Sequence, residues 1–418
     1  MKTLFCPIHG FWRFGRRVDD LDRIHTLFSR THTFIMYEGQ RRNAISAIRR
    51  RAKAFLLSGL WPLLCVASSV RHLFRYGPAI RKRTGRRLIR QFMDQLHLGL
   101  WHNIPPDSYY RFSLYHQDNR RRASSYIHHH EPAWLAMVFA SVEDRRILDD
   151  KSLFPDFCER LRISTPAVLA RFESGMMVVV DKRIENGLPA VDLFSKPVEG
   201  VIGQGIARWE IEENGEYSDG KGGMLIEEQL IEHLAALSLH EIYLLQPRLR
   251  NHPDLDAVSM GGLCSARIIT CRVPGQEPVL AFAALRMPRG QAATDNFSAG
   301  GIACAIDGDR GELFGSALGT EPLSERLDCH PDTKRPIAGI VLPQWDTAVS
   351  MCLRAHEQLA TCPGIGWDVG FTTDGPMLIE GNLQFGEGLP QIVGCTPLLE
   401  TSYKSALLGF LEQSDEFK

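Results

Sequence analysis

The chain has 418 residues, 44% of them hydrophobic and 23% charged, with 36 Gly, 23 Pro and a formal net charge of -1. This length and composition exclude a small disulfide-stapled protein, a collagen-like chain and a wholly disordered chain, and they favour two or three compact units. The small net charge conceals a split. Residues 1–130 hold 24 Lys and Arg against 7 Asp and Glu, whereas the remaining residues hold 24 against 42. The two regions are therefore expected to have different roles.

The basic charge of residues 1–130 leaves two interpretations open. A basic region binds a polyanion such as nucleic acid or anionic lipid, or it docks on the acidic remainder of the same chain. Among polyanions, an anionic membrane surface contacted through residues 49–90 is favoured over nucleic acid, because this segment combines apolar and basic residues.

Residues 54–70 contain no charged side chain, and basic residues flank them on both sides. A membrane-spanning helix needs about 20 apolar residues, and this stretch is shorter and contains Pro62 and several serines. We therefore predict a buried or surface-lying helix. Apolar residues recur at three and four positions through to about residue 98, which predicts a mainly helical N-terminal region.

The cysteines and the start of the chain bear on the compartment. None of the ten cysteines forms a Cys-x-x-Cys pair or a repeated spacing, so we expect them to be reduced and buried. The first residues lack the uninterrupted apolar run of a secretory signal. We expect a cytoplasmic protein, peripheral at the inner face of the membrane if the N-terminal helices contact lipid.

After residue 149 the pattern changes to alternating strands and helices. Short apolar and β-branched runs predict strands, and apolar residues spaced by three and four predict two helices. The expected strands lie at 178–180, 190–194, 242–245, 266–270, 279–286, 301–306, 367–371 and 377–381, and the expected helices at 227–237 and 348–359.

The last two expected strands flank a turn that contains Asp374-Gly375, a pair typical of tight hairpins. A hairpin centred on Asp374 places Asp368 opposite Glu380, and Asn382 shares the face of Glu380. Opposed carboxylates repel unless a cation lies between them, and oxygen ligands of this kind suit Mg²⁺ bound to phosphates. Judged from this segment alone, the alternative to a metal site is an exposed hairpin whose acidic residues have no functional role.

A glycine-rich segment follows the expected strand near residue 194. Lys196 stands at its start, and Gly200, Gly203 and Gly205 follow. Glycines let backbone N–H groups approach phosphate oxygens, and a lysine adds a positive charge. An ordinary glycine-rich hairpin fits the segment equally well.

Two arginines, Arg267 and Arg286, lie on separate expected strands. Arginines so placed hold an anion in bidentate fashion or face solvent. Motifs of other chemistries, such as G-x-S-x-G, H-E-x-x-H and finger-type Cys/His spacing, do not occur in the sequence.

A series of short motifs runs from about residue 99 to residue 391. The series consists of Ile104-Pro105-Pro106-x-x-Tyr109-Tyr110, Asp150-Lys151, Lys196 to Gly205, Leu245-Gln246-x-x-Leu249-Arg250-Asn251-His252-Pro253, Ser265-Ala266-Arg267, Asp295-Asn296-Phe297-x-x-Gly300-Gly301, His330-Pro331-Asp332-Thr333, Leu342-Pro343-x-Trp345, Gly366-Trp367-Asp368 and Ile379-Glu380-Gly381-Asn382. In this order the motifs resemble the sugar-transfer-associated ATP-grasp family, which is described as related to α-L-glutamate ligases.

The resemblance implies an α+β protein with a C-terminal ATP-grasp fold, in which two α/β lobes hold ATP between them. The expected divisions are a basic, mainly helical N-terminal region at 1–98, a pre-grasp segment at 99–150 and the ATP-grasp domain at 151–418. Within that domain we expect an ATP-binding lobe at 151–246 and a metal and substrate lobe at 247–418.

The resemblance also assigns roles to residues, position by position. It implies phosphate contacts from Lys151, Lys196, Gly200, Gly203 and Gly205, adenine contacts from Leu245 and Gln246, Mg²⁺ or Mn²⁺ ligation by Asp368, Glu380 and Asn382, and contacts to the γ-phosphate and substrate end from Arg267, Arg286 and Asn296. Two positions depart from the pattern. Gly366 stands where many carboxylate–amine ligases have arginine, and Gln246 stands where many relatives have an acid.

The implied activity is ATP-dependent ligation of a carboxylate to an amine through an acylphosphate. The expected partners are a small-molecule or glycan-precursor carboxylate and an amine. Two alternatives remain open: an ATP-grasp kinase that needs no amine, and a nucleotide-binding scaffold without turnover that attaches to a membrane or polyanion.

Overall fold

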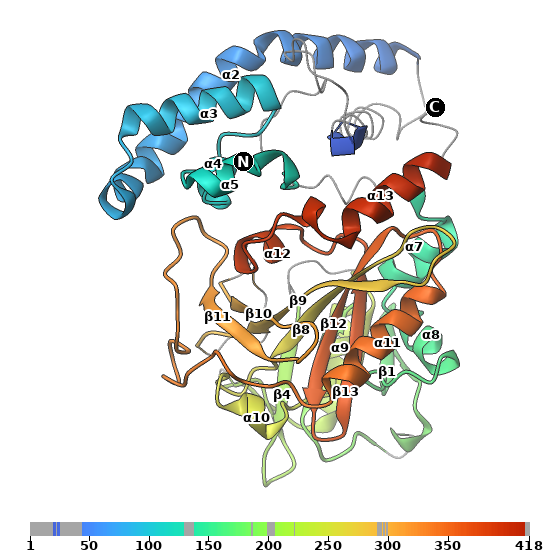
Figure 1. Cartoon of the computed structure of the whole chain (residues 1–418). Coiled ribbons are helices and arrows are strands. Elements are labelled where there is room, and N and C mark those ends of the chain that lie inside the picture. Colours follow the sequence, from blue (N-terminus) through green and yellow to red (C-terminus); the bar gives the residue numbers. More distant parts are fainter. Residues whose placement is uncertain are drawn as a thin grey trace.

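The computed structural model describes residues 20–21, 23–25, 44–128, 138–184, 187–198, 205–220, 222–290, 295, 297 and 300–413. Two antiparallel sheets make up most of the C-terminal part of the chain, and helices dominate the N-terminal part (Figure 1). The predicted α+β class and the mainly helical N-terminal region are confirmed.

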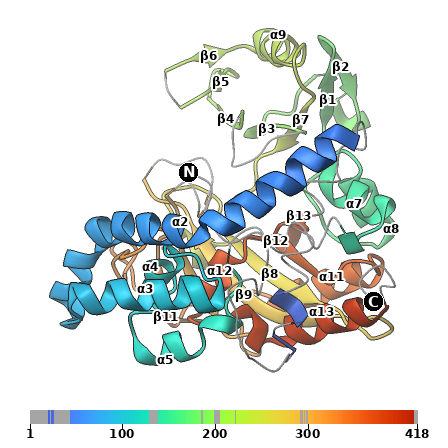
Figure 2. The same ribbon diagram turned by 90° about the horizontal axis from the view of Figure 1, so that it is seen from above.

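The first sheet has the strand order β2-β1-β7-β3-β4-β5-β6. Helix α9, Glu227–Leu237, packs on this sheet, and the two form the first lobe (Figure 2). The strands are β1 Ala170–Glu173, β2 Met176–Val179, β3 Leu193–Pro197, β4 Ala207–Ile211, β5 Tyr217–Ser218, β6 Met224–Leu225 and β7 Tyr243–Pro247. Side chains alternate along β3, so that Leu193 and Ser195 are buried on the side of the lobe core while Lys196 lies on the opposite face.

The second sheet has the order β11-β10-β9-β8-β12-β13 and forms the second lobe together with the helices on its two faces. Its strands are β8 Ser265–Cys271, β9 Val279–Met287, β10 Ile302–Ile306, β11 Leu313–Leu318, β12 Gly364–Thr372 and β13 Gly375–Asn382. The flanking helices are α7 Val142–Asp149, α8 Phe154–Arg160, α11 Trp345–Glu357, α12 Gly388–Val393 and α13 Ser402–Gln413, and the short α10 Pro253–Asp256 precedes the sheet. All nine residues of β12 are buried, because helices cover both faces of the sheet.

The core of the second lobe includes side chains from the helices that precede both sheets. Leu148 of α7 and Phe154 of α8 belong to the same apolar cluster as Trp367 of β12. Helices α7 and α8 therefore share one core with the second sheet, and the predicted division between residues 150 and 151 stays a prediction.

The same lobe contains a buried polar group in its interior. Trp367 Nε1 donates to Thr270 Oγ1 at 2.8 Å, that hydroxyl lies 2.7 Å from His356 Nδ1, and His356 Nε2 lies 2.9 Å from the Cys362 carbonyl. Burial lowers the pKa of His356 to about 4, so the imidazole is neutral near pH 7.

The cysteines of the described part of the chain are all unpaired, as predicted. Most are buried, and burial raises the pKa of the thiols of Cys65 and Cys271 to about 11. The exposed Cys329 and Cys395 correct the expectation that all of them lie inside.

The N-terminal helices are α2 Ala44–Thr84, α3 Leu88–His102, α4 Ser108–Arg111 and α5 Gln117–Arg121. Helix α2 runs through the uncharged stretch at 54–70, which confirms the predicted helix there. Trp61 and Cys65 on one face are buried, whereas Leu63 on the other face is exposed, so the helix lies on the surface. None of the described helices is both long and apolar enough to traverse a bilayer.

Residues 104–127 connect these helices to the second lobe. The Gln391 side chain bridges to this segment, because its Oε1 accepts from Ile127 N at 2.8 Å and its Nε2 donates to Ile127 O at 2.9 Å. Arg122 Nη2 contacts Glu400 Oε2 at 2.5 Å. These contacts attach residues 104–127 to α12 and to Glu400 of the second lobe.

Candidate nucleotide and metal site

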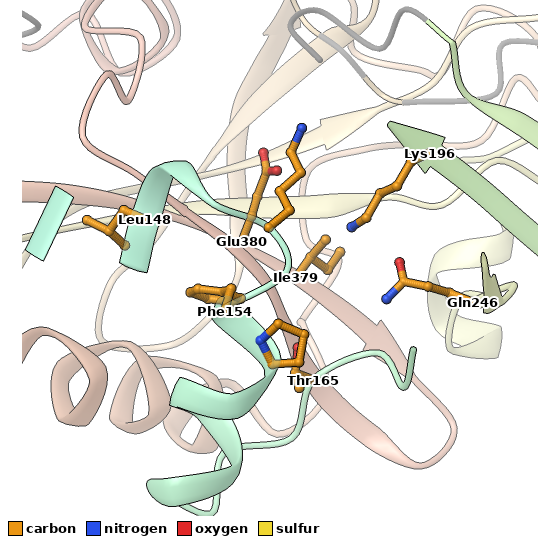
Figure 3. A pocket seen from close by; sticks show the side chains of 9 residues that line it. Leu148, Phe154, Thr165, Lys196, Gln246, Ile379 and Glu380 are labelled. Atoms are coloured by element: carbon orange, nitrogen blue, oxygen red, sulfur yellow. The ribbon is translucent and has the colours of Figure 1, made fainter. Parts of the chain in front are cut away.

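A pocket lies where the first lobe meets the edge strand β13 of the second lobe. Figure 3 shows Lys196 and Gln246 reaching into it from the first sheet, opposite Ile379 and Glu380 of β13. Its lining residues are Leu148, Lys151, Phe154, Pro155, Thr165, Lys196, Gln246, Ile379 and Glu380. The pocket therefore combines an apolar wall with two lysines, an amide and a carboxylate.

Lys196 occupies the pocket face of β3. Burial lowers the pKa of Lys196, and the nearby charge of Lys151 lowers it further, while Glu380 and Asp368 act in the opposite direction. The side chain of Lys196 forms no salt bridge or hydrogen bond within the described residues. The pocket thus brings together the two lysines that the sequence assigned to phosphate binding.

Lys151 lies in the turn between α7 and α8. Ser141 caps α7 by accepting from Asp144 N at 3.0 Å, and Asp150 Oδ1 accepts from Ser152 N at 2.9 Å directly after the helix. These local hydrogen bonds fix the turn that carries Lys151 to the rim of the pocket.

The register of the β12–β13 hairpin matches the prediction at the acidic pair, where Asp368 faces Glu380. Nearer the turn the register changes, because Val369 pairs with Leu378 and leaves Ile379 as an extra residue. A bulge changes the direction in which the side chains of a strand point. Consecutive residues of a regular strand point to opposite faces, but here Ile379 and Glu380 both line the pocket.

Asp368 is the centre of a buried ionic cluster. Arg267 Nε donates to Asp368 Oδ1 at 2.6 Å, and Arg286 Nη2 donates to Asp368 Oδ2 at 2.9 Å. Burial favours the neutral acid, but the two guanidinium groups outweigh this effect and hold the pKa of Asp368 below its ordinary value. The carboxylate is therefore ionised.

Asp295 and Ser265 complete this cluster, and sequence reasoning did not name either as a site residue. Asp295 Oδ2 accepts from Ser265 N at 2.7 Å and from Ser265 Oγ at 2.5 Å, and Asp295 Oδ1 lies 3.5 Å from Arg286 Nη2. Arg286 Nη2 also donates to Ser265 Oγ at 2.5 Å. The motifs Ser265-Ala266-Arg267 and Asp295-Asn296 were the available signals, but nothing in the sequence shows that they meet.

Gly366 leaves room for the cluster. A Cβ at this position would lie 2.3 Å from Phe385 Cβ and 3.1 Å from Arg267 Cδ. On β8, Arg267 pairs with Asp368 of β12, and its Nη1 donates to the Phe385 carbonyl at 2.5 Å. The guanidinium next to the first acid is therefore supplied by the neighbouring strand.

The two residues expected to contact adenine, Leu245 and Gln246, point to different sides of β7. Gln246 lines the pocket, and its Nε2 donates to the Pro166 carbonyl at 3.2 Å. The side chain of Leu245 lies in the core of the first lobe, and its carbonyl accepts from Leu169 N at 2.8 Å. Only Gln246 of this pair presents its side chain to the pocket.

The remaining predicted residues fall in three groups. Arg267 and Arg286 join Asp368 beside the pocket rather than lining it. Gly205 has φ +75°, and a Cβ there would approach the Tyr243 hydroxyl to 2.9 Å, so the end of the loop requires glycine. Gly200, Gly203 and Asn296 lie outside the described residues.

The donors at the hairpin suit a hard divalent cation. Asn382 Nδ2 donates to Glu380 Oε1 at 3.2 Å, so these two side chains are neighbours, and Asp368 faces Glu380 across the hairpin. No group of three or more His, Cys, Asp or Glu side chains in the described part of the chain gathers as a metal site. A cation here would rely on two carboxylates, one amide and phosphate oxygens, which is the usual environment of Mg²⁺.

Several solved structures resemble the chain at low sequence identity. D-alanine–D-alanine ligase from Helicobacter pylori is 11% identical and has a TM-score of 0.38, and the match covers 68% of this chain and 65% of that one. L-amino acid ligase from Bacillus licheniformis is 12% identical with a TM-score of 0.36, and 64% and 48% are covered. A RimK domain ATP-grasp protein from Sphaerobacter thermophilus is 14% identical with a TM-score of 0.33, and 64% and 69% are covered. The chain thus spans less than two thirds of the H. pylori and B. licheniformis ligases.

The family assignment is based on a sequence model rather than on these distant likenesses. No curated protein matches the chain. The model of the family described as sugar-transfer associated ATP-grasp matches residues 138–404, which is more than half of the chain and includes both sheets and the pocket. The chain belongs to the sugar-transfer-associated ATP-grasp family.

Proposed function

We propose that this protein is an ATP- and Mg²⁺-dependent carboxylate–amine ligase that acts through an acylphosphate. The observation that carries the proposal is that Lys196 of the first lobe and Glu380 of the second lobe line one pocket. Family membership supports the same nucleotide chemistry. The buried cluster around Asp368 lies directly beside that pocket, since Asp368 pairs with Glu380.

The pocket walls suit the parts of a nucleotide. Leu148, Phe154 and Ile379 offer apolar surface for a purine, and Gln246 offers an amide for its edge. Lys196 and Lys151 are the two lysines of the pocket lining, and we propose that they contact the phosphates. Mg²⁺ when bound would neutralise phosphate charge, and Glu380, Asn382 and Asp368 would hold it.

The proposed reaction has two steps. A carboxylate oxygen of the substrate attacks the γ-phosphorus of ATP, the bond to the bridging oxygen breaks, and ADP leaves. An amine then attacks the acylphosphate carbon and phosphate departs, with the amine proton passing to solvent. Such transfers rely on positioning and charge stabilisation, a role that we propose for Arg267 and Arg286, which lie beside the pocket.

For the substrate we propose a carboxylate of a polysaccharide or glycoconjugate precursor, in a cytoplasmic setting. The support for this class is the description of the family as sugar-transfer associated.

ADP release tests the proposal. The purified full chain is incubated with ATP, Mg²⁺ and mixtures of sugar acids, amino acids and amines, and ADP is quantified. We expect ADP release that requires both an acid and an amine, and its loss in Asp368→Ala and Glu380→Ala. The matched control is Glu213→Ala, because Glu213 is an exposed acid of the first lobe and does not line the pocket.

Two results would contradict the ligase. A phosphorylated product formed without any amine would identify a kinase. Nucleotide binding without ADP release from any acid and amine mixture would identify a scaffold without turnover.

A further inference from the structure

The outer face of α2 carries an apolar stripe. Its six large apolar side chains are all exposed, and they recur every three or four residues, which places them along one side of the helix. They are Leu56, Leu60, Leu63, Val66, Val70 and Phe74, and the exposed fractions of Leu63 and Phe74 reach 69% and 79%. We call these six residues the outer stripe.

The opposite face of α2 packs against α3, so the outer stripe is not the face through which α2 contacts the rest of the protein. Trp61 and Cys65 are buried against α3, and Trp61 Nε1 donates to the Gly99 carbonyl at 2.9 Å. Helix α3 lies beside α2 in both views (Figures 1 and 2), and it adds the exposed Ile89 and Met93. The two helices therefore present apolar side chains on the side that faces away from their shared core.

The charged side chains of α2 itself all have one sign, and within the described residues the acid paired with them is Glu321 of the second lobe, 3.8 Å from Arg75. Helix α2 contains nine Lys and Arg residues and no Asp or Glu. Four exposed cations near the α2–α3 turn form no ion pair or hydrogen bond through their side chains within the described residues. These are Arg81, Lys82, Arg87 and Arg90.

An anionic bilayer surface matches this combination better than other partners. An amphipathic helix with cations beside its apolar face lies in the head-group region, where the apolar side chains enter the acyl boundary. A nucleic acid would leave the outer stripe exposed to water. A second copy docked through the same face would bring two basic, acid-free helices together, which like-charge repulsion opposes.

We infer that α2 and α3 dock the protein on an anionic membrane surface through the outer stripe and the adjacent cations. Figure 1 shows α2 at the margin of the molecule, with α12 and α13 between it and the second sheet. Because residues 104–127 are anchored to the second lobe through Gln391 and Arg122, docking holds both lobes on the aqueous side.

Vesicle flotation tests the inference with the full chain. The probes are phosphatidylcholine vesicles with and without phosphatidylglycerol, at low and high salt. We expect flotation only with phosphatidylglycerol, and weaker flotation at high salt because surface charge is screened. Leu63→Glu and Phe74→Glu should each weaken binding by roughly tenfold or more, the loss expected when one large apolar side chain no longer enters the membrane.

The cations are tested separately. The double variant Arg87→Ala/Arg90→Ala should bind phosphatidylglycerol vesicles more weakly by roughly fivefold for each cation removed. Its matched control is Arg310→Ala/Arg326→Ala, which removes two exposed arginines of the second lobe. The control for the stripe is Phe314→Glu, because Phe314 of β11 is an exposed aromatic residue of another surface.

Clear outcomes would overturn the inference. Wild-type protein that stays at the bottom of the gradient with phosphatidylglycerol vesicles excludes the docking, as does equal flotation of wild type, Leu63→Glu and Phe74→Glu. A Phe74→Glu variant that converts a wild-type dimer to a monomer without changing flotation assigns the outer stripe to self-association instead. Thermal unfolding of each variant shows that it is folded.

Discussion

The two sides of the pocket handle charge in opposite ways. On the second lobe, Arg267, Asp368 and Asp295 are buried, and Arg286 is only 12% exposed and pairs with both acids. On the first lobe, burial lowers the pKa of Lys196, and its side chain forms no salt bridge within the described residues. The charges of the second lobe therefore compensate one another, whereas the ammonium group of Lys196 has no paired carboxylate within the described residues, and we expect an anionic ligand to compensate it.

Removal of Asp368 should have the largest effect on stability. The change Asp368→Ala leaves Arg267 and Arg286 buried without their shared carboxylate, which we expect to destabilise the fold by about 3–5 kcal/mol. Urea unfolding monitored by tryptophan fluorescence measures this. The paired variant Glu380→Gln should unfold at nearly the same urea concentration as the wild type. Equal losses of stability in Asp368→Ala and Glu380→Gln would contradict the expectation that Asp368, and not Glu380, compensates the two arginines.

Acid should destabilise the second lobe in two separate windows. Unfolded His356 takes up a proton near pH 6.5 but the folded residue only near pH 4, so stability is complete above pH 6.5 and falls by about 3 kcal/mol towards pH 4. The pKa of Asp368 is lower in the folded protein than in the unfolded chain, so its ionised form stabilises the fold at any pH above the ordinary carboxylate pKa. This stabilisation is lost as the pH falls below that value towards the lowered pKa.

Unfolding measured against pH separates the two groups. His356→Gln should flatten the change in the free energy of unfolding between pH 6.5 and pH 4 and leave the loss at lower pH, to which Asp368 contributes. If the free energy of unfolding of His356→Gln depends on pH between 4 and 6.5 as steeply as that of the wild type, the buried imidazole does not cause the loss of stability in this range.

The change Asp295→Asn should have an intermediate effect. The amide oxygen can still accept from Ser265, but Arg286 loses one of its two carboxylates, and we expect a loss of about 1–3 kcal/mol. Denaturant unfolding checks the stability, and the ratio of kcat to KM checks whether Arg286 has moved. Wild-type values for both would show that Asp295 does not position Arg286.

The smallest stability change is expected for Lys196→Met. Removing a buried ammonium group relieves its desolvation, so the free energy of unfolding should change by less than about 1 kcal/mol, or should rise. ATP affinity measured by calorimetry should nevertheless fall roughly 10–100-fold, the loss of one charge-assisted phosphate contact. A large loss of stability with unchanged ATP affinity would show that Lys196 stabilises the fold and does not bind the nucleotide, contrary to our account.

The sequence predicted those parts of the fold that depend on local patterns. The hairpin turn and the alternation of side chains placed Asp368 opposite Glu380, as the structure shows. The bulge at Ile379 was not predictable, because a one-residue change of register depends on packing against other segments. For this reason the sequence did not indicate that Ile379 lines the pocket beside Glu380.

The parts of the site that escaped prediction are joined only in three dimensions. Leu148 and Phe154 are apolar residues of helices, and their spacing does not distinguish a pocket wall from an ordinary core position. Asp295 lies 30 residues from Ser265 in the chain, and its hydrogen bonds to Ser265 depend on the approach of two distant segments. The requirement for glycine at position 366 can be explained only from the structure, in which Arg267 and Phe385 leave no space for a side chain there.

A crystal structure with Mg²⁺ and a non-hydrolysable ATP analogue tests the central claim most directly. The account predicts that the triphosphate lies between Lys196 and the hairpin acids Asp368 and Glu380, with the base against Phe154 and Gln246. A nucleotide bound elsewhere, or phosphates that contact neither Lys196 nor the metal-side acids, would contradict it.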